Sequence, residues 1–299
     1  MNSLDNSIKH TSNIRIKDSY KKLSILELPI FCVFIAGYSI WVVAILLRLL
    51  WNVPFYITLP ISILGVYLLF HVIHDAIHGS VSNSQFINNL LGNIGFIPFY
   101  FAPFDTFKYL HLQHHSNLNI PHSDPDYNTS GKFCCNNAFM GIFFHTFYYY
   151  YYFFRNTIYS IKNYNKLITW SVLIITIHAC ITIHAIQNSY INDVLILWII
   201  PAFLSTIILT YLFDYIPHRD HSISIKNNKY KATHMTQGIF SRNPNTKLLS
   251  ILTLNQLTYH NIHHLWPKIP FDRYPLIWNE YRSELIKRET PLQTIFNNT

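Results

Sequence analysis

Four long stretches of apolar residues give the chain its main pattern. They cover residues 29–50, 55–73, 167–186 and 194–213, and none of them has an internal Asp, Glu or Lys. A helix needs about 20 residues to cross the hydrocarbon core of a bilayer, which is roughly 30 Å thick. The pattern therefore predicts an all-α, multi-pass integral membrane protein with a four-helix bundle, in one domain that covers residues 1–299.

Two further apolar stretches are less regular. Residues 88–104 are interrupted by two glycines and two prolines. We expect an interfacial or re-entrant segment there, because broken helix is tolerated in a membrane only where protein covers it. Residues 139–154 include five consecutive tyrosines, and tyrosine is enriched at the headgroup level of the bilayer. This second stretch is therefore expected to be an interfacial helix.

Basic residues are distributed unevenly between the segments that flank the spans. Five Lys and Arg precede the first span, five lie in residues 75–166 and eleven lie in the tail from residue 215, whereas the connections 51–54 and 187–193 have none. The positive-inside rule then places both termini and the long middle segment in the cytoplasm. The formal net charge of +8 is mostly this asymmetry, so we expect no nucleic-acid partner.

Composition agrees with a membrane protein. Half of the residues are apolar and 12% are charged, well below the roughly one quarter that is typical of soluble domains. The first apolar stretch is long enough to remain as an anchor instead of a cleaved signal, and residues 1–28 are expected to be a flexible cytoplasmic segment. The four cysteines, Cys32, Cys134, Cys135 and Cys180, form neither a metal-binding spacing nor a plausible disulfide framework.

Histidines form three groups with helical spacing. They are His74 and His78; His111, His114 and His115; and His260, His263 and His264. On a helix, positions i, i+3 and i+4 fall within an arc of roughly 100°, so the rings of each group project toward one point. Neutral imidazole suits iron, zinc, copper and nickel. Eight rings are too many for one ion, and two adjacent metals with four or five ligands each would use nearly all of them.

The predicted topology puts the three groups on one side of the membrane. The first group lies at the cytoplasmic end of the second span, and the second group follows without a clear crossing. A hairpin of two spans then returns the chain to the cytoplasm before the third group. An odd number of crossings between any two groups would have made a shared site impossible. A cytoplasmic helical region with a histidine-rich site for two metals is therefore expected.

Other histidines have ordinary explanations. His71 lies one turn before the first group, so its ring could contact a metal-binding histidine. A hydrogen bond within the helix bundle is the simpler interpretation. His178 and His184 lie in the third span, and we expect interhelical hydrogen bonds for them. No motif surrounds the remaining ones, which are His10, His122, His145 and His234.

Four acidic residues near the histidine groups have two possible roles. Asp75, Asp124, Asp126 and Asp214 either accept hydrogen bonds from ligand imidazoles and fix their tautomers, or cap helices and form turns. Asp124-Pro125-Asp126 is a good turn signal in its own right. The Glu-x-x-His pattern of soluble di-iron bundles is absent from the sequence.

Longer motifs around the histidines carry a family resemblance. They are HDAIHGS at 74–80, HLQHH at 111–115 followed by DPD at 124–126, FDYIPHR at 213–219, and HNIHHLWPKIP at 260–270. Together they resemble the membrane fatty acid desaturase and hydroxylase superfamily. The closest branch is the desaturase-like β-carotene hydroxylases of cyanobacteria and other bacteria, and the resemblance covers residues from about 30 to 280.

The resemblance implies a chemistry and a set of ligands. It implies a centre of two non-haem irons on the cytoplasmic side of a four-helix membrane bundle, which uses O2 and two external electrons. The reaction is hydroxylation of the end ring of β-carotene, through cryptoxanthin to zeaxanthin. The implied metal ligands are His74, His78, His111, His114, His115, His218, His260, His263 and His264, with His221 as a competitor for the position of His218.

The sequence also bears on partners and alternatives. It contains no cytochrome b5 motif and no ferredoxin cysteine set, so a separate, ferredoxin-like electron donor is expected. Asp272 and Arg273 stand where the resemblance leads us to expect aromatic residues, which leaves carotenoid ketolase and fatty acyl-lipid desaturase open. A non-catalytic metal carrier is disfavoured because the histidine groups lie at one edge of the spans and not along their depth.

Overall fold

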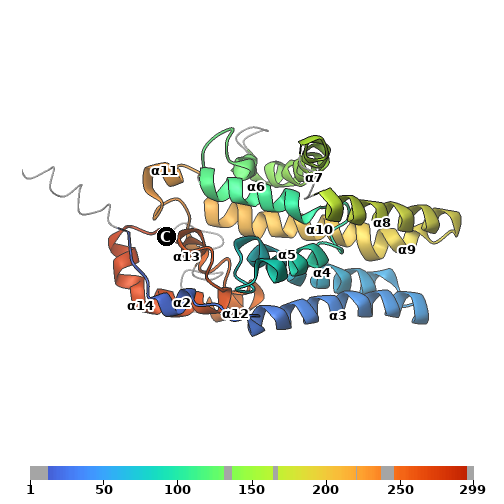
Figure 1. The fold of residues 1–299 in the computed structure, drawn as a ribbon, viewed down its shortest axis with the longest axis horizontal. Helices are drawn as coiled ribbons and strands as arrows, with labels where there is room; N and C mark the ends of the chain where they lie inside the picture. Colours follow the sequence, from blue (N-terminus) through green and yellow to red (C-terminus); the bar gives the residue numbers. More distant parts are fainter. Residues whose placement is uncertain (1–12, 131–136, 164–167, 220, 237–245, 295–299) are drawn as a thin grey trace, which may run out of the picture. The chain divides into compact units, whose positions relative to one another are not determined.

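The computed structural model describes residues 13–130, 137–163, 168–219, 221–236 and 246–294 (Figure 1). The chain divides into two compact units. The first unit is Leu23–Ile216, and the second, here the C-terminal unit, is Met1–Lys22 with Pro217–Thr299. In the described part of the chain the regular structure is helical apart from two strands of two residues, which confirms the all-α fold class. The single domain over residues 1–299 stays a prediction.

The first two spans form a helical hairpin. α3 (Leu28–Trp51) and α4 (Phe55–His78) lie side by side, as Figure 1 shows. Their backbones approach so closely that a Cβ at Gly65 would lie 2.8 Å from the nitrogen of Trp41 and 2.9 Å from the carbonyl oxygen of Gly37. Small residues at such a point let helices pack by van der Waals contact where lipid offers no hydrophobic driving force.

The segment between the second span and the helix that carries His111 is broken, as its glycines and prolines predict. α5 (Gln85–Gly95) is followed by turns over residues 96–103 and then by α6 (Phe104–Asn117). A Cβ at Gly92 would collide with the ring of Phe104, so this glycine lets the first residue of α6 pack on α5. Residues 85–117 are therefore two helices joined by turns, and the interfacial or re-entrant location of residues 88–104 stays a prediction.

Polar side chains from the spans hold these turns. The indole N–H of Trp198 donates to the carbonyl of Ile97 at 3.0 Å, and the same oxygen lies 3.0 Å from Nε2 of His178. Nδ1 of His178 in turn accepts the backbone N–H of Phe101 at 3.2 Å. Backbone polar groups away from water need such partners. His178 is thus hydrogen-bonded, but the prediction of an interhelical partner is wrong, because its partners belong to the turns of residues 96–103.

The remaining helices of the first unit follow in order. They are the 3₁₀ segment η1 (Pro125–Ser130), α7 (Ala138–Asn163), α8 (Ile168–Gln187), α9 (Ile191–Val194), η2 (Leu195–Ile199), α10 (Ile200–Leu209) and η3 (Thr210–Tyr215). η2 and η3 are π-helical. Together with the 3₁₀ turn η4 (Ile216–His218) they make one apolar helical segment from Ile191 to His218.

Three helices in the described residues are long and apolar enough to span a membrane. They are Leu28–Trp51, Phe55–His78 and Ile191–His218, and a shorter apolar stretch covers Val172–Gln187 within α8. These segments correspond to the four predicted spans, and the chain is a helical membrane protein. α7 is not among the three long candidates, and its location at the interface stays a prediction.

Arg48, the one basic residue of the predicted spans, lies near the end of α3. Its Nε is 2.7 Å from Oδ1 of Asp193, and its Nη1 is 3.4 Å from the carbonyl oxygen of Val53. The guanidinium thus ends at the helix connections, from which a long basic side chain can reach the membrane interface.

The C-terminal unit is built from short elements around a small apolar core. Its elements are α2 (Asp18–Lys21), α11 (Ile225–Asn228), β1 (Met235–Thr236), α12 (Thr246–Leu252), α13 (His260–Leu265), η5 (Phe271–Arg273), α14 (Tyr274–Lys287) and β2 (Leu292–Gln293). β1 pairs with β2 in parallel. Leu257, Ile262 and Ile277 are fully buried in this unit.

Within the C-terminal unit, the described residues of the N-terminal segment contact residues 273–280. Nζ of Lys17 is 2.8 Å from Oε1 of Glu280, and Nη1 of Arg273 donates to the carbonyls of Tyr20 and Lys22 at 3.1 and 2.7 Å. Residues 1–12, which include His10, lie outside the described residues, as do Cys134 and Cys135. Flexibility of residues 1–28 stays a prediction.

Candidate metal centre

The first pair of predicted ligands lies in the last turn of α4. The helix continues past the predicted end of the span at Ile73 and stops after His78, where Gly79 has a φ of 71°. This left-handed conformation suits glycine, which has no Cβ to clash. His74 and His78 are 4% and 6% exposed, and their ring centroids are 5.1 Å apart. The helix therefore presents both imidazoles on one buried face.

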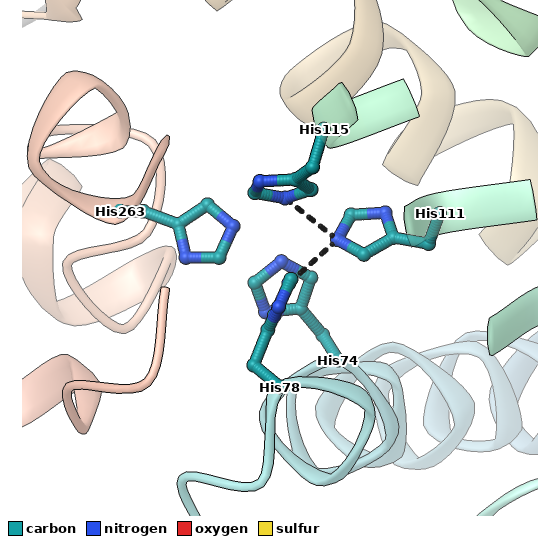
Figure 2. Close-up of side chains that lie close together, drawn as sticks. All are labelled: His74, His78, His111, His115 and His263. Carbon is teal, nitrogen blue, oxygen red and sulfur yellow. Dashed lines mark hydrogen bonds between the residues drawn. The ribbon is translucent and has the colours of Figure 1, made fainter. Parts of the chain in front are cut away.

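α6 brings a second pair of rings to the same point. Nε2 of His111 lies 2.9 Å from Nε2 of His78 and 3.1 Å from Nε2 of His115. Figure 2 shows the rings from α4 and α6 pointing toward one another, with these two contacts as dashed lines. The ligand nitrogens of His74, His78, His111 and His115 all lie within 4.8 Å of one another. The predicted convergence of these four side chains is present in the structure.

The spacing of these nitrogens fits a shared cation. With metal–nitrogen distances of about 2.1 Å, two imidazole nitrogens bound at a right angle are about 3.0 Å apart, and two in a tetrahedral site about 3.4 Å. The contacts of 2.9 and 3.1 Å agree with the first value. Burial lowers the pKa of His115 well below its usual value, and the neighbouring rings of His78 and His111 lower it further. The ring is therefore kept in the neutral form that binds metals.

His114 has a different environment on the same helix. Its Nδ1 lies 2.8 Å from Oδ1 of Asp124 and 3.1 Å from Oδ2 of Asp126, and all three residues are buried. Burial disfavours the charged ring, but the two carboxylates outweigh it and raise the pKa of His114 to about 9. With its proton on Nδ1 directed at the carboxylates, Nε2 is the nitrogen available to a metal, which would displace the proton there.

The Asp-Pro-Asp segment is both a turn and a source of hydrogen-bond acceptors. Oδ2 of Asp124 accepts the backbone N–H of Asn119 at 2.8 Å, and its Oδ1 accepts that of Asp126 at 2.9 Å. These bonds fix the Asp124 carboxylate within the loop that enters η1. The segment is therefore a turn, as predicted, and it also contacts the ring of His114; the orientation of a metal ligand by these carboxylates stays a prediction.

The other two acidic residues make weaker or different contacts. Oδ1 of Asp75 is 3.4 Å from Nδ1 of His74, a long contact for a hydrogen bond. The side chain of Asp214 bonds to Thr210 one turn earlier on its own helix. A ligand-orienting role for either residue stays a prediction.

Four more predicted ligands lie together in the C-terminal unit. Nε2 of His260 is 3.0 Å from Nε2 of His218 and 3.0 Å from Nε2 of His264. These three side chains and that of His263 are buried. His221, the competitor for the position of His218, is also buried, with its ring centroid 6.3 Å from that of His218. Here too, imidazole nitrogens converge at distances that suit a common cation.

Neutral groups contact these rings at Nδ1, on the side away from the converging Nε2 atoms. Nδ1 of His260 is 3.2 Å from the carbonyl oxygen of Gln256, and Nδ1 of His263 is 3.1 Å from the hydroxyl of Tyr274. The amide of Asn261, between the two histidines in sequence, donates to the carbonyls of Tyr230 and Thr233 at 3.0 Å. These contacts hold the six-residue helix α13 in place with its histidines on one side.

Histidines outside the predicted set have other partners. The ring of His71 lies against that of Phe213, with centroids 5.4 Å apart. His184 is exposed, and its Nδ1 is 3.2 Å from Nδ2 of Asn188 one turn later. His122 is exposed as well, and Nδ1 of His234 is 3.1 Å from the carbonyl oxygen of Pro217.

One buried histidine beside the Asp-Pro-Asp segment was not predicted to contact the site. His145 of α7 is 1% exposed, and its Nε2 lies 3.5 Å from Oδ1 of Asp126. No metal-binding motif surrounds it, and the available signal is its one-turn spacing from Tyr149, whose hydroxyl donates to Oδ1 of Asp126.

The chain is similar to known proteins over most of its length. A family model described as "Fatty acid desaturase" matches residues 51–296. A beta-carotene ketolase and a beta-carotene 4-ketolase 3, both from Haematococcus lacustris, are each 23% identical to the chain over 208 residues, which are 69% of this chain and 57% of each relative. The chain thus matches little more than half the length of these relatives.

A third relative matches a shorter part. An sn-1 oleoyl-lipid 12-desaturase from Picosynechococcus sp. is 38% identical over 69 residues, which are 22% of this chain and 20% of that protein.

Proposed function

Because this chain belongs to the fatty acid desaturase family, we propose that it is an O2-dependent membrane oxygenase with two non-haem irons. Its substrate is an apolar lipid, in the first place the end ring of β-carotene, which it hydroxylates to give zeaxanthin. The observation that supports the metal site most strongly is the convergence of Nε2 atoms from the buried His78 and His111 and the half-buried His115.

Nine histidines are the proposed ligands of the two irons. Those of the first unit are His74, His78, His111, His114 and His115, and those of the C-terminal unit are His218, His260, His263 and His264. In each unit imidazole nitrogens lie about 3 Å apart, the spacing of neighbouring ligands on one ion. Nine neutral donors suit two ions with four or five protein ligands each and leave positions open for O2.

The side chains around the ligands would exclude water and orient the rings. Iron, when bound, supplies O2 activation and the oxidising power to cleave an unactivated C–H bond. The ring of Phe70 lies 6.0 Å from that of His74, and Phe107 stacks on His111 at 5.8 Å between centroids. Asp124 holds the proton on Nδ1 of His114, which leaves Nε2 for the metal. The protein thus provides a dry, preoriented set of donors.

The carotenoid substrate rests on motif resemblance and on the similar proteins. The motifs after His264 and around His218 resemble carotene hydroxylases, and two relatives are carotene ketolases. Ring ketolation is therefore the nearest alternative reaction. The local similarity to an oleoyl-lipid desaturase favours acyl-lipid desaturation as a second candidate.

We further propose that both termini and the metal centre face the cytoplasm. The tail from residue 215 carries eleven Lys and Arg against five Asp and Glu, which supports this orientation. The two electrons for each turnover come from a separate donor protein. A ferredoxin-like protein, usually acidic, would be attracted to this basic face.

Expression in cells that accumulate β-carotene tests the function. Pigment extraction and chromatography should reveal cryptoxanthin and zeaxanthin with the wild-type chain, and unchanged β-carotene with His114→Ala. The matched control is His184→Ala, which removes an exposed histidine outside the proposed ligand set and should keep full activity. Keto-carotenoids in place of hydroxylated ones would make the chain a ketolase. Untouched β-carotene with new acyl double bonds would contradict the carotenoid substrate.

A further inference from the structure

Two buried side chains of α7 point at the carboxylate of Asp126. His145 and Tyr149 are 1% and 5% exposed and lie one helical turn apart, so they share a face of the helix. The hydroxyl of Tyr149 donates to Oδ1 of Asp126, and Nε2 of His145 lies 3.5 Å from the same oxygen. The proposed ligand set uses neither residue.

The other oxygen of Asp126 faces the metal-binding helix. Oδ2 of Asp126 is 3.1 Å from Nδ1 of His114. This carboxylate therefore connects α7 to α6, with two α7 side chains on one oxygen and a proposed metal ligand on the other. A change at Tyr149 or His145 would reach His114 through a single carboxylate.

Asp124 and Asp126 are fixed in different ways. Both oxygens of Asp124 accept backbone N–H groups, from Asn119 and from Asp126. Among the described residues, the carboxylate of Asp126 is instead approached by the side chains of Tyr149, His145 and His114. The loop itself sets the orientation of Asp124, whereas that of Asp126 depends on α7.

We propose that His145 and Tyr149 are positioning residues that hold the carboxylate of Asp126 3.1 Å from Nδ1 of His114, beside the oxygen of Asp124 that accepts the Nδ1 proton. A carboxylate beside Nδ1 favours the tautomer with its proton there and holds the ring of a metal-binding histidine, and loss of such an outer partner typically weakens metal binding about 10–100-fold. The inference rests on the proposed function because it requires His114 to be a metal ligand. It adds two residues of α7 that touch neither metal nor substrate.

The first test measures iron affinity in the purified full-length protein. Fe(II) binding is followed by competition with a chelator for the wild type, Tyr149→Phe, His145→Phe and His145→Gln. Tyr149→Phe and His145→Phe should weaken the binding of at least one iron about tenfold. His145→Gln, which keeps an N–H donor near Asp126, should restore most of the affinity. Failure of glutamine to do better than phenylalanine would count against a hydrogen-bonding role for His145.

The matched control is Tyr148→Phe on the same helix. The hydroxyl of Tyr148 bonds to that of Tyr152, so its removal deletes a tyrosine hydrogen bond on the same helix that does not reach Asp126. Iron affinity should change less than about twofold in this variant. An equal loss in Tyr148→Phe and Tyr149→Phe would mean that both act through the packing of α7, and the proposal would be wrong.

A double-mutant cycle identifies the route of the effect. Residues that act through one shared partner are not additive. In an Asp126→Asn background, Tyr149→Phe should change iron affinity less than about twofold, although it costs about tenfold alone. If the double variant loses affinity by the product of the two separate losses, the two residues act independently and the proposal is wrong. Thermal unfolding of the metal-free variants should match that of the wild type, which separates positioning from a loss of fold.

The outcome for the wild type separates the proposed function from this inference. If the wild-type protein binds no iron, both fail. If the wild type binds two irons and Tyr149→Phe binds them equally well, the proposed function stands and the inference alone is refuted.

Discussion

The chain carries the pattern His-x-x-His-His twice, and the two copies lie in different surroundings. The first is on α6, a helix of 14 residues whose His114 contacts the carboxylates of Asp124 and Asp126. The second is on α13, a helix of six residues whose His260 and His263 contact a backbone carbonyl and a tyrosine hydroxyl. The same motif thus has histidine rings in contact with carboxylates in one unit and with neutral groups in the other.

This difference bears on how strongly each ring binds a cation. An anionic acceptor at Nδ1 makes the opposite nitrogen a better donor and fixes the ring, whereas a carbonyl or hydroxyl mainly fixes the ring. We therefore expect the α6 copy to depend on its outer partners more than the α13 copy does. The ligands themselves should be equally necessary in both.

The largest effects are expected from loss of a ligand in either copy. His114→Ala and His263→Ala should each abolish product formation and lower iron content while the protein still inserts into membranes, because each removes a donor that no neighbour replaces. Pigment chromatography and metal analysis measure both results. Full activity in either variant would refute its assignment as a ligand.

Loss of the group that contacts Nδ1 of a histidine should have a larger effect in the α6 copy than in the α13 copy. Asp124→Asn should weaken iron binding or activity about 10–100-fold, because it removes the anionic acceptor of His114. Tyr274→Phe, which deletes the neutral partner of His263, should cost less than about tenfold. Chelator competition measures the loss of iron affinity in each variant, and the loss should be larger in Asp124→Asn. Equal losses would show that the charge of the outer partner does not matter.

Metal removal should loosen α13 more than α6. At a free iron concentration of about 100 times Kd, binding adds about 2.7 kcal/mol to the stability of the folded state, and a chelator removes this contribution. α13 has only six residues, whereas α6 is longer and is also fixed by the carboxylate contacts of His114. Hydrogen exchange with and without chelator should therefore reveal the larger loss of protection in residues 260–265. Equal loss in both helices would contradict the comparison.

The smallest effect on the metal centre is expected from the packing of α6. Gly92→Ala places a methyl group against the ring of Phe104, and overpacking of this kind typically costs about 1–3 kcal/mol. The melting temperature should fall, with at most a small loss of iron. Phe104→Leu in the same chain should recover part of the loss, and no recovery would place the strain elsewhere.

Much of the fold follows from local pattern. The four apolar stretches correspond to α3, α4, α8 and the segment from Ile191 to His218, because length and apolarity alone decide whether a helix can cross a bilayer. The π-helical turns of η2 and η3 could not be predicted, since they arise from packing between helices. The position of α7 at the interface depends on the bilayer and stays a prediction.

The site was predictable where its geometry lies within one helix. His74 and His78 share a face of α4, and His111 and His115 share a face of α6, because residues four apart on a helix are neighbours. Asp126 and His145 are 19 positions apart in sequence and meet only through the packing of α7 against η1. Sequence spacing does not report such a contact, so the role of α7 became apparent only in the structure.

The number of irons bound per chain tests the central claim most directly. The purified full-length protein, reconstituted with Fe(II) and freed of loosely bound metal, should contain two irons per chain, held by the histidines of both units. Zero or one iron per chain would contradict the account.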